Sequence, residues 1–165
     1  MNYNNVKLIV VVVVQIYKPI IRPIVTYGCE TWAMTITEQN HLLVFARKIL
    51  RKINGLTLDS DGTWRIKTNE ELEMLIKKKN ILRFIKSQRL RWAAHVIRMD
   101  TTRTVKKLTE WEPCSSRAVG RPRLRWLDQV GEDLKKMKVR NWREKCKDRR
   151  LWNKILKQAK THQGL

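Results

Sequence analysis

The clearest secondary-structure signal in the chain lies in Leu42–Ile53, which reads LLVFARKILRKI. Its apolar residues recur at the i, i+3, i+4 and i+7 spacing that places them on one face of an α-helix. The basic residues between them fall on the opposite face. Thr35 and Glu38 fit a capping box before this helix, and Gly55 fits a cap at its C-terminal end. The segment therefore predicts an amphipathic helix with one buried side and one basic side.

The same helical pattern continues toward the C-terminus. Thr68 and Glu71 form a second capping box ahead of a short helix. An apolar stripe predicts a longer helix over residues 80–99. Its first residue, Asn80, is a good N-cap. Apolar stripes then predict one helix over residues 126–137 and a last helix over residues 141–159, with Asn141 and Glu144 as the cap of the last one. We therefore predict an all-α fold: a small helical bundle, a basic helical C-terminal lobe, and an apolar N-terminal segment.

Composition divides the chain into three regions. Residues 1–99 form a helical region, residues 100–117 a linker marked by proline and serine, and residues 118–165 a basic helical C-terminal region. Within the first 25 residues, a run of five valines favours a strand by propensity, and periodicity leaves strand and helix open. The apolar run is much shorter than the roughly 20 residues that a membrane span needs, so we predict no membrane segment.

The charge of the chain indicates a polyanionic partner. There are 36 Lys and Arg residues against 15 Asp and Glu residues, for a formal net charge of +21. This self-repulsion destabilises a compact state unless a polyanion neutralises it, and nucleic acid and an anionic membrane surface are the two candidates. A hydrophobic content of 42% still supports a core, which excludes a disordered basic tail.

The cysteines and histidines give no sign of a metal site or a disulfide framework. Cys29, Cys114 and Cys146 are scattered and odd in number, they lack C-x-x-C spacing, and the three histidines do not complete a zinc site. We therefore predict no metal and no cofactor, with reduced thiols in an intracellular protein.

The strongest candidate binding segment is Gly120–Trp126, which reads GRPRLRW. Pro122 suits the first turn of a helix, where backbone N–H groups also favour anions. Arg121 and Arg123 can hold phosphate in bidentate forks, and Trp126 offers either a stacking plane or a core anchor. The alternative interpretation is a solvated basic turn with a core tryptophan behind it.

Basic side chains of the 80–99 helix complete the predicted nucleic-acid site. They lie between its apolar positions, and Trp92 and His95 share one face because they are three residues apart. A packed or phosphate-facing His95 is favoured over a catalytic one, and most of the seven tryptophans are expected in the core. The predicted nucleic-acid-binding residues are Arg83, Lys86, Arg89, Arg91, Trp92, His95, Arg98, Arg121, Arg123, Arg125 and Trp126.

Five blocks of residues follow one another along nearly the whole chain. They are residues 20–32 (IIRPIVTYGCETW), 47–55 (RKILRKING), 90–99 (LRWAAHVIRM), 120–126 (GRPRLRW) and 148–152 (DRRLW). Together they resemble the region after the palm in non-LTR retrotransposon reverse transcriptases, in the same order and at similar spacing. One block alone is weak evidence, whereas five in register are strong.

The resemblance implies the C-terminal piece of an endonuclease–reverse transcriptase polyprotein, with residues 1–99 thumb-like. In that family this region contacts template, primer or element RNA, in the nucleus or in a cytoplasmic ribonucleoprotein. The family polymerase needs paired aspartates to hold two magnesium ions, and this chain has no Asp-Asp pair. The resemblance therefore implies a chain that is not an enzyme, that binds RNA or DNA largely nonspecifically, and that could contact the missing palm domain.

Three other functions stay open. Gly120-Arg121-Pro122 is part of the Arg-Gly-Arg-Pro core of minor-groove hooks, but Val119 replaces an arginine that such hooks need. A helical protein-interaction module would dock its apolar faces on a partner such as the palm. A truncated element fragment would have no function of its own.

Overall fold

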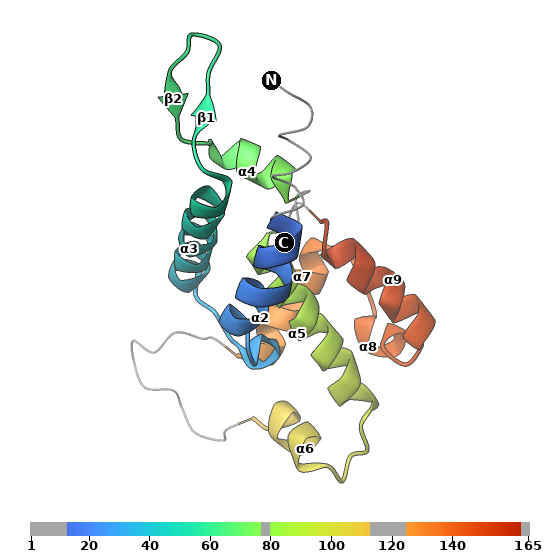
Figure 1. Cartoon of the computed structure of the whole chain (residues 1–165). Helices are drawn as coiled ribbons and strands as arrows, with labels where there is room; N and C mark the ends of the chain where they lie inside the picture. Colours follow the sequence, from blue (N-terminus) through green and yellow to red (C-terminus); the bar gives the residue numbers. More distant parts are fainter. Residues whose placement is uncertain (1–12, 77–79, 113–124, 163–165) are drawn as a thin grey trace. The chain divides into compact units, whose positions relative to one another are not determined.

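The computed structural model describes residues 13–76, 80–112 and 125–162 (Figure 1). Helices dominate these ranges, and the strands within them are two short ones that pair as a hairpin. The predicted all-α fold is therefore confirmed. Residues 6–12 of the apolar run and residues 120–124 of the GRPRLRW segment lie outside the described residues.

Packing divides the chain into two compact units. The first comprises Met1–Tyr27 and Ile36–Phe84, and the second comprises Gly28–Thr35 and Ile85–Leu165. The boundary near the middle of the chain thus falls inside the helix α5, Ile81–Arg98, and not in the predicted linker at residues 100–117. Within the predicted linker, Thr104–Glu110 form the helix α6, and residues 113–117 lie outside the described residues.

The first unit begins with helical turns. A π-helix, η1, spans Val13–Ile21, and α2 spans Arg22–Val25. Val13 and Val14, the described end of the valine run, are therefore helical although their propensity favours a strand. Tyr17 of η1 is buried, and its phenol pKa is raised by that burial although the nearby Arg22 charge opposes the shift.

The amphipathic helix predicted first is α3, Ile36–Asn54. Ala46 and Leu50 lie on its buried face, as the pattern predicted, whereas Phe45 stays partly exposed. The helix ends at Gly55, whose φ of 64° is left-handed and whose N–H donates to the Arg51 carbonyl over 2.9 Å. The predicted C-terminal cap is confirmed.

A small hairpin follows α3 and leads into α4, Asn69–Leu75 (Figure 1). Its strands are β1, Thr57–Leu58, and β2, Trp64–Arg65, paired antiparallel with Thr57 opposite Arg65. Arg65 forms a bidentate ion pair with Glu71 at 2.9 and 2.6 Å, which fixes one face of the hairpin on α4. Leu58 and Trp64 form a cross-strand pair on the other face, and both are exposed.

Two predicted N-terminal caps are confirmed by their hydrogen bonds. The Glu71 N–H donates to Thr68 Oγ1 over 3.3 Å, and the Thr68 N–H donates to Glu71 Oε2 over 2.7 Å, which completes the capping box of α4. At the start of α5, the Arg83 N–H donates to Asn80 Oδ1 over 2.9 Å. These are local features, readable from a few neighbouring residues.

The second unit is built around the C-terminal half of α5. It also contains the 3-10 turn η2, Cys29–Thr31, and the helices α6, α7 (Trp126–Lys136), α8 (Trp142–Lys145) and α9 (Arg149–Ala159). Side chains of α5, α7 and α9 share one apolar core, which is why residues 85–98 of α5 belong with residues that were predicted to form a separate lobe. The buried members of this core are Leu90, Ala93, Ala94, Val130, Leu134, Cys146, Trp152, Ile155, Leu156 and Ala159.

The predicted single helix over 141–159 is wrong, because the structure divides it into α8 and α9. Asn141 has a left-handed φ of 51° and makes no side-chain cap. Asp148 provides the cap instead, since its Oδ1 accepts from the backbone N–H groups of Arg150 and Leu151 over 2.7 and 3.1 Å. The break lets Cys146 and Trp152 both reach the core, and the Trp152 indole N–H donates to the Leu90 carbonyl over 3.2 Å.

Candidate nucleic-acid interface

Three predicted phosphate-binding residues of α5 are buried. Arg83, Lys86 and Arg89 are 7, 5 and 1% exposed. The Arg89 guanidinium donates to the Asp133 carboxylate and to the Gln129 side-chain oxygen, and Lys86 Nζ lies 3.6 Å from Asp133 Oδ1. These contacts hold the Lys86 and Arg89 side chains inside the second unit, which argues against a phosphate contact by either, and Arg83 is buried as well.

This buried polar network holds the segment Gly28–Thr35 within the second unit. Arg89 donates to the Trp32 carbonyl over 3.2 Å. The Met34 N–H donates to Gln129 Oε1 over 3.0 Å, and Gln129 Nε2 donates to the Met34 carbonyl over 2.6 Å. The side-chain amide of Gln129 thus exchanges two hydrogen bonds with the Met34 backbone, as a paired residue of a neighbouring β-strand would. Desolvation lowers the pKa of Lys86, although the Asp133 charge opposes that shift.

Two predicted residues of α5, Arg91 and His95, are exposed and suited to contact a ligand. His95 lies beside Trp92, with 5.2 Å between ring centroids, so the two aromatic rings share a face as the spacing predicted. Arg98 is half-buried, and its Nη1 donates to the Cys146 carbonyl over 2.6 Å. Arg98 therefore has a structural contact within the second unit.

Of the predicted GRPRLRW segment, the structure describes Arg125 and Trp126. Arg121 and Arg123 lie outside the described residues. Arg125 Nη1 forms an ion pair with Glu112 Oε1 at 2.9 Å, and the Trp126 indole N–H donates to the Glu30 carbonyl over 2.7 Å. Trp126 is half-buried and packs against the core of the second unit.

The structure brings three of the predicted residues together at one pocket. Trp92, Arg125 and Trp126 line a cavity of about 610 Å³ whose lining residues all belong to the second unit. Trp111 also lines it and is 65% exposed. Among the described tryptophans only Trp152 is fully buried, so the expectation that most of them lie in the core is wrong.

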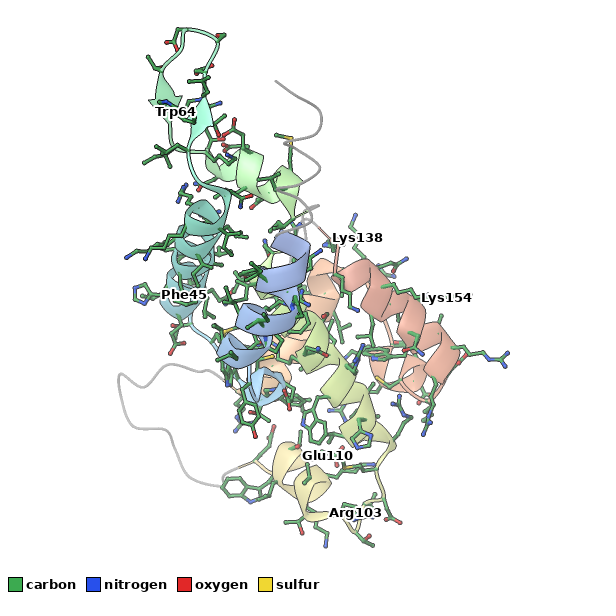
Figure 2. All side chains as sticks on the ribbon, in the orientation of Figure 1. Phe45, Trp64, Arg103, Glu110, Lys138 and Lys154 are labelled. Atoms are coloured by element: carbon green, nitrogen blue, oxygen red, sulfur yellow. The ribbon has the colours of Figure 1, made fainter. Side chains whose placement is uncertain are left out.

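In the part of the chain that the structure describes, a basic surface lies on α9, which the predicted site omitted. Arg150, Lys154 and Lys157 are exposed and follow the i, i+4, i+7 spacing of a single helix face; we call them the α9 basic stripe. Figure 2 marks Lys154 on this helix. The opposite face, with Trp152, is buried in the core. The sequence already indicated this surface, because the basic residues of α9 recur at helical spacing between its apolar residues.

Acidic residues near the α9 basic stripe are engaged locally. Between residues 135 and 160 the sequence has twelve Lys and Arg residues and two acidic ones, Glu144 and Asp148. Glu144 pairs with Lys147 at 3.2 Å, and Asp148 caps α9. Like charges at i, i+4 on a helix are destabilising, so an exposed stripe of three cations favours an anionic ligand.

The described residues hold no cluster of three or more His, Cys, Asp or Glu side chains that could bind a metal ion. Cys29 and Cys146 are buried thiols, and desolvation raises the pKa of Cys146 to about 12. No helix in the described ranges is long and apolar enough to cross a membrane.

Comparisons with known proteins give one distant relative. No protein-family model matches the chain, and no solved structure matches it. The chain is 26% identical, over 155 residues, to a transposon-derived protein of Caenorhabditis elegans. The match covers 90% of this chain and 55% of that protein, so the chain spans about half the length of its relative. This similarity supports an origin of the chain in a transposable element.

Proposed function

We propose that the chain is a non-catalytic C-terminal region of a non-LTR retrotransposon reverse transcriptase, and that it binds RNA or DNA through the α9 basic stripe. The similarity to a transposon-derived protein supports an origin in a transposable element, and the five sequence blocks support the element type. On this proposal the partner is element RNA or a template–primer duplex, met in the nucleus or in a cytoplasmic ribonucleoprotein.

The observation that carries the proposal is the two-sided character of α9. Its apolar residues are buried in the core of the second unit, which fixes the orientation of the helix there. Its cations then project together from the opposite side and have no ion pair among the described residues. Contacts of this kind are made to phosphates and carry no base specificity. The binding is therefore largely nonspecific and sensitive to salt.

A salt titration of binding to a labelled duplex and a labelled single strand tests the proposal. In the triple variant Arg150→Gln, Lys154→Gln, Lys157→Gln, three phosphate contacts are lost. The slope of log K against log salt should then fall by about 2.7 on duplex and about 2.1 on a single strand.

A matched control removes the same charge elsewhere. Lys48 and Lys52 lie exposed on α3 of the first unit, and Arg103 lies exposed before α6. The triple Gln variant at these positions has the same net charge as the α9 variant and should keep most of the slope. If the wild-type chain shows no salt slope with either nucleic acid, the proposal fails and a fragment without function becomes the better account.

A second candidate function is a docking surface for another protein, such as the palm domain. Exposed apolar side chains favour it, namely Ile20 of η1, Ile24 of α2 and Tyr27, two residues after α2. Titration of the chain with a purified palm region should give saturable binding that is weakened by Ile20→Ser and Ile24→Ser. Binding that the two serine substitutions leave unchanged would exclude this surface.

A further inference from the structure

The pocket of about 610 Å³ in the second unit has an unusual lining for so basic a chain. Three indoles contribute to it, from Trp92 on α5, Trp111 after α6, and Trp126 at the start of α7. Three of the fifteen acidic residues of the chain also line it. Those acidic residues are Glu110, Glu112 and Asp128.

The indoles provide flat apolar walls at defined positions. Trp126 is held by its hydrogen bond to the Glu30 carbonyl, and Trp92 lies against the His95 ring. Trp111 is largely exposed, so its ring is accessible from solvent. An aromatic ring of this kind can stack on a base that has left its own stack, whatever the sequence.

The carboxylates give the pocket its chemical preference. Glu112 is paired with Arg125 at 2.9 Å, and Glu110 lies 3.9 Å from Arg143. Asp128 is exposed and has no ion pair among the described residues. An ionised carboxylate is an acceptor with two oxygens and offers no donor. It therefore favours a partner that presents two adjacent N–H donors.

Guanine is the base that presents such a pair, through N1–H and the N2 amino group on its Watson–Crick edge. Uracil presents one N–H between two carbonyl oxygens, which a carboxylate repels. Arg125 lies at the same pocket, and its partner Glu112 is largely exposed, so the guanidinium can exchange that weak pair for a backbone phosphate.

We propose that this pocket accepts an unstacked base of single-stranded RNA or DNA and prefers guanine, with Asp128 accepting from its Watson–Crick edge. This inference rests on the proposed function, because the basic surface must first attract the strand. A cationic side chain would also suit indoles and carboxylates. The net charge of +21 disfavours that ligand, since the whole chain repels cations.

Competition binding with the full chain tests the inference. The two probes are a ten-nucleotide oligouridine and the same oligomer with one central guanosine. The wild-type chain should bind the guanosine probe about five- to tenfold more tightly, as one good bidentate contact allows. Asp128→Asn should remove that ratio while binding to oligouridine persists, and Trp111→Ala should weaken both probes.

Two control variants separate this inference from the proposed function. Trp64→Ala removes a tryptophan that is 67% exposed on the hairpin of the first unit, and it should change neither affinity. The α9 triple variant should weaken both probes equally and keep the guanosine ratio. Thermal unfolding followed by circular dichroism should show that Asp128→Asn and Trp111→Ala remain folded, since both side chains are exposed.

Four outcomes would overturn the inference. Equal affinity of the wild-type chain for both probes, or a guanosine ratio unchanged in Asp128→Asn, would reject the pocket and leave the proposed function standing. Failure to bind either probe would reject the inference, and it would reject the proposed function as well if the chain also showed no salt-dependent binding to the duplex. Displacement of the guanosine probe by N-acetyl-lysine methylamide, but not by its norleucine analogue, would show a cation site instead.

Discussion

Asp133 should be among the side chains on which the second unit most depends. Its carboxylate binds the Arg89 guanidinium and lies 3.6 Å from the Lys86 ammonium, and all three groups are buried. The substitution Asp133→Asn keeps the shape of the side chain but leaves two buried cations without a counter-charge. Breaking a buried pair in this way costs about 3–5 kcal/mol.

The loss can be measured by urea unfolding followed by tryptophan fluorescence and by thermal unfolding. For a chain of this size, 3–5 kcal/mol corresponds to a decrease in Tm on the order of 10 °C. Asp128→Asn is a matched control, because it makes the same change on the same helix at an exposed position. It should change the free energy of unfolding by less than about 0.5 kcal/mol. A loss below about 1 kcal/mol in Asp133→Asn would refute the assignment of Arg89 and Lys86 to a buried network.

A second variant distinguishes the loss of the counter-charge from the loss of the side chain itself. Replacing Asp133, Arg89 and Lys86 together by apolar residues of similar volume removes the charges as well as the pair. Such replacements are often neutral or stabilising in other buried networks, so the triple variant should recover most of the stability lost in Asp133→Asn. Full recovery is not expected, because the Trp32 carbonyl loses the donor that Arg89 supplies.

Three further predictions follow from local features. Asp148→Ala removes the N-cap of α9 and should lower the free energy of unfolding by about 1 kcal/mol, measured by urea denaturation. The bidentate pair with Arg65 lowers the Glu71 pKa to about 2, so its contribution is complete above the unfolded pKa near 4.5 and is lost as the pH falls toward 2. Glu71→Gln should therefore be less stable than the parent chain at pH 7, and the difference should close near pH 2; a constant difference across that range would contradict the pair. The Cys146 thiol, with its pKa raised to about 12, should resist iodoacetamide at pH 8 until urea unfolds the chain, and mass-spectrometric mapping of the alkylated cysteine checks this.

Features carried by neighbouring residues were predictable from the sequence. The capping box at Thr68, the N-cap at Asn80 and the terminal glycine at Gly55 each depend on residues within one helical turn. The core-facing stripe of α7 was also readable, because Val130 and Leu134 are four residues apart. The apolar period and the caps together were enough to predict an all-α fold.

The burial of the basic residues on α5 was not predictable in the same way. Arg89 is separated from Asp133 by 44 residues and from Trp32 by 57, and no local pattern links them. A basic residue between apolar positions predicts a solvated face, unless another element supplies a carboxylate there. The α9 basic stripe shows the opposite case, since its cations project from a helix with only one buried side.

The two compact units are interleaved along the chain, and this sets an order for folding during synthesis. Residues 28–35 belong to the second unit although the first unit lies on both sides of them in the sequence. The Met34 backbone is paired with Gln129, 95 residues further on. As the polypeptide leaves the ribosome, this early segment must therefore wait for α7 before its backbone groups gain those partners. A gene copy with a stop codon before the codon for Gln129 would encode a chain in which residues 28–35 never acquire them.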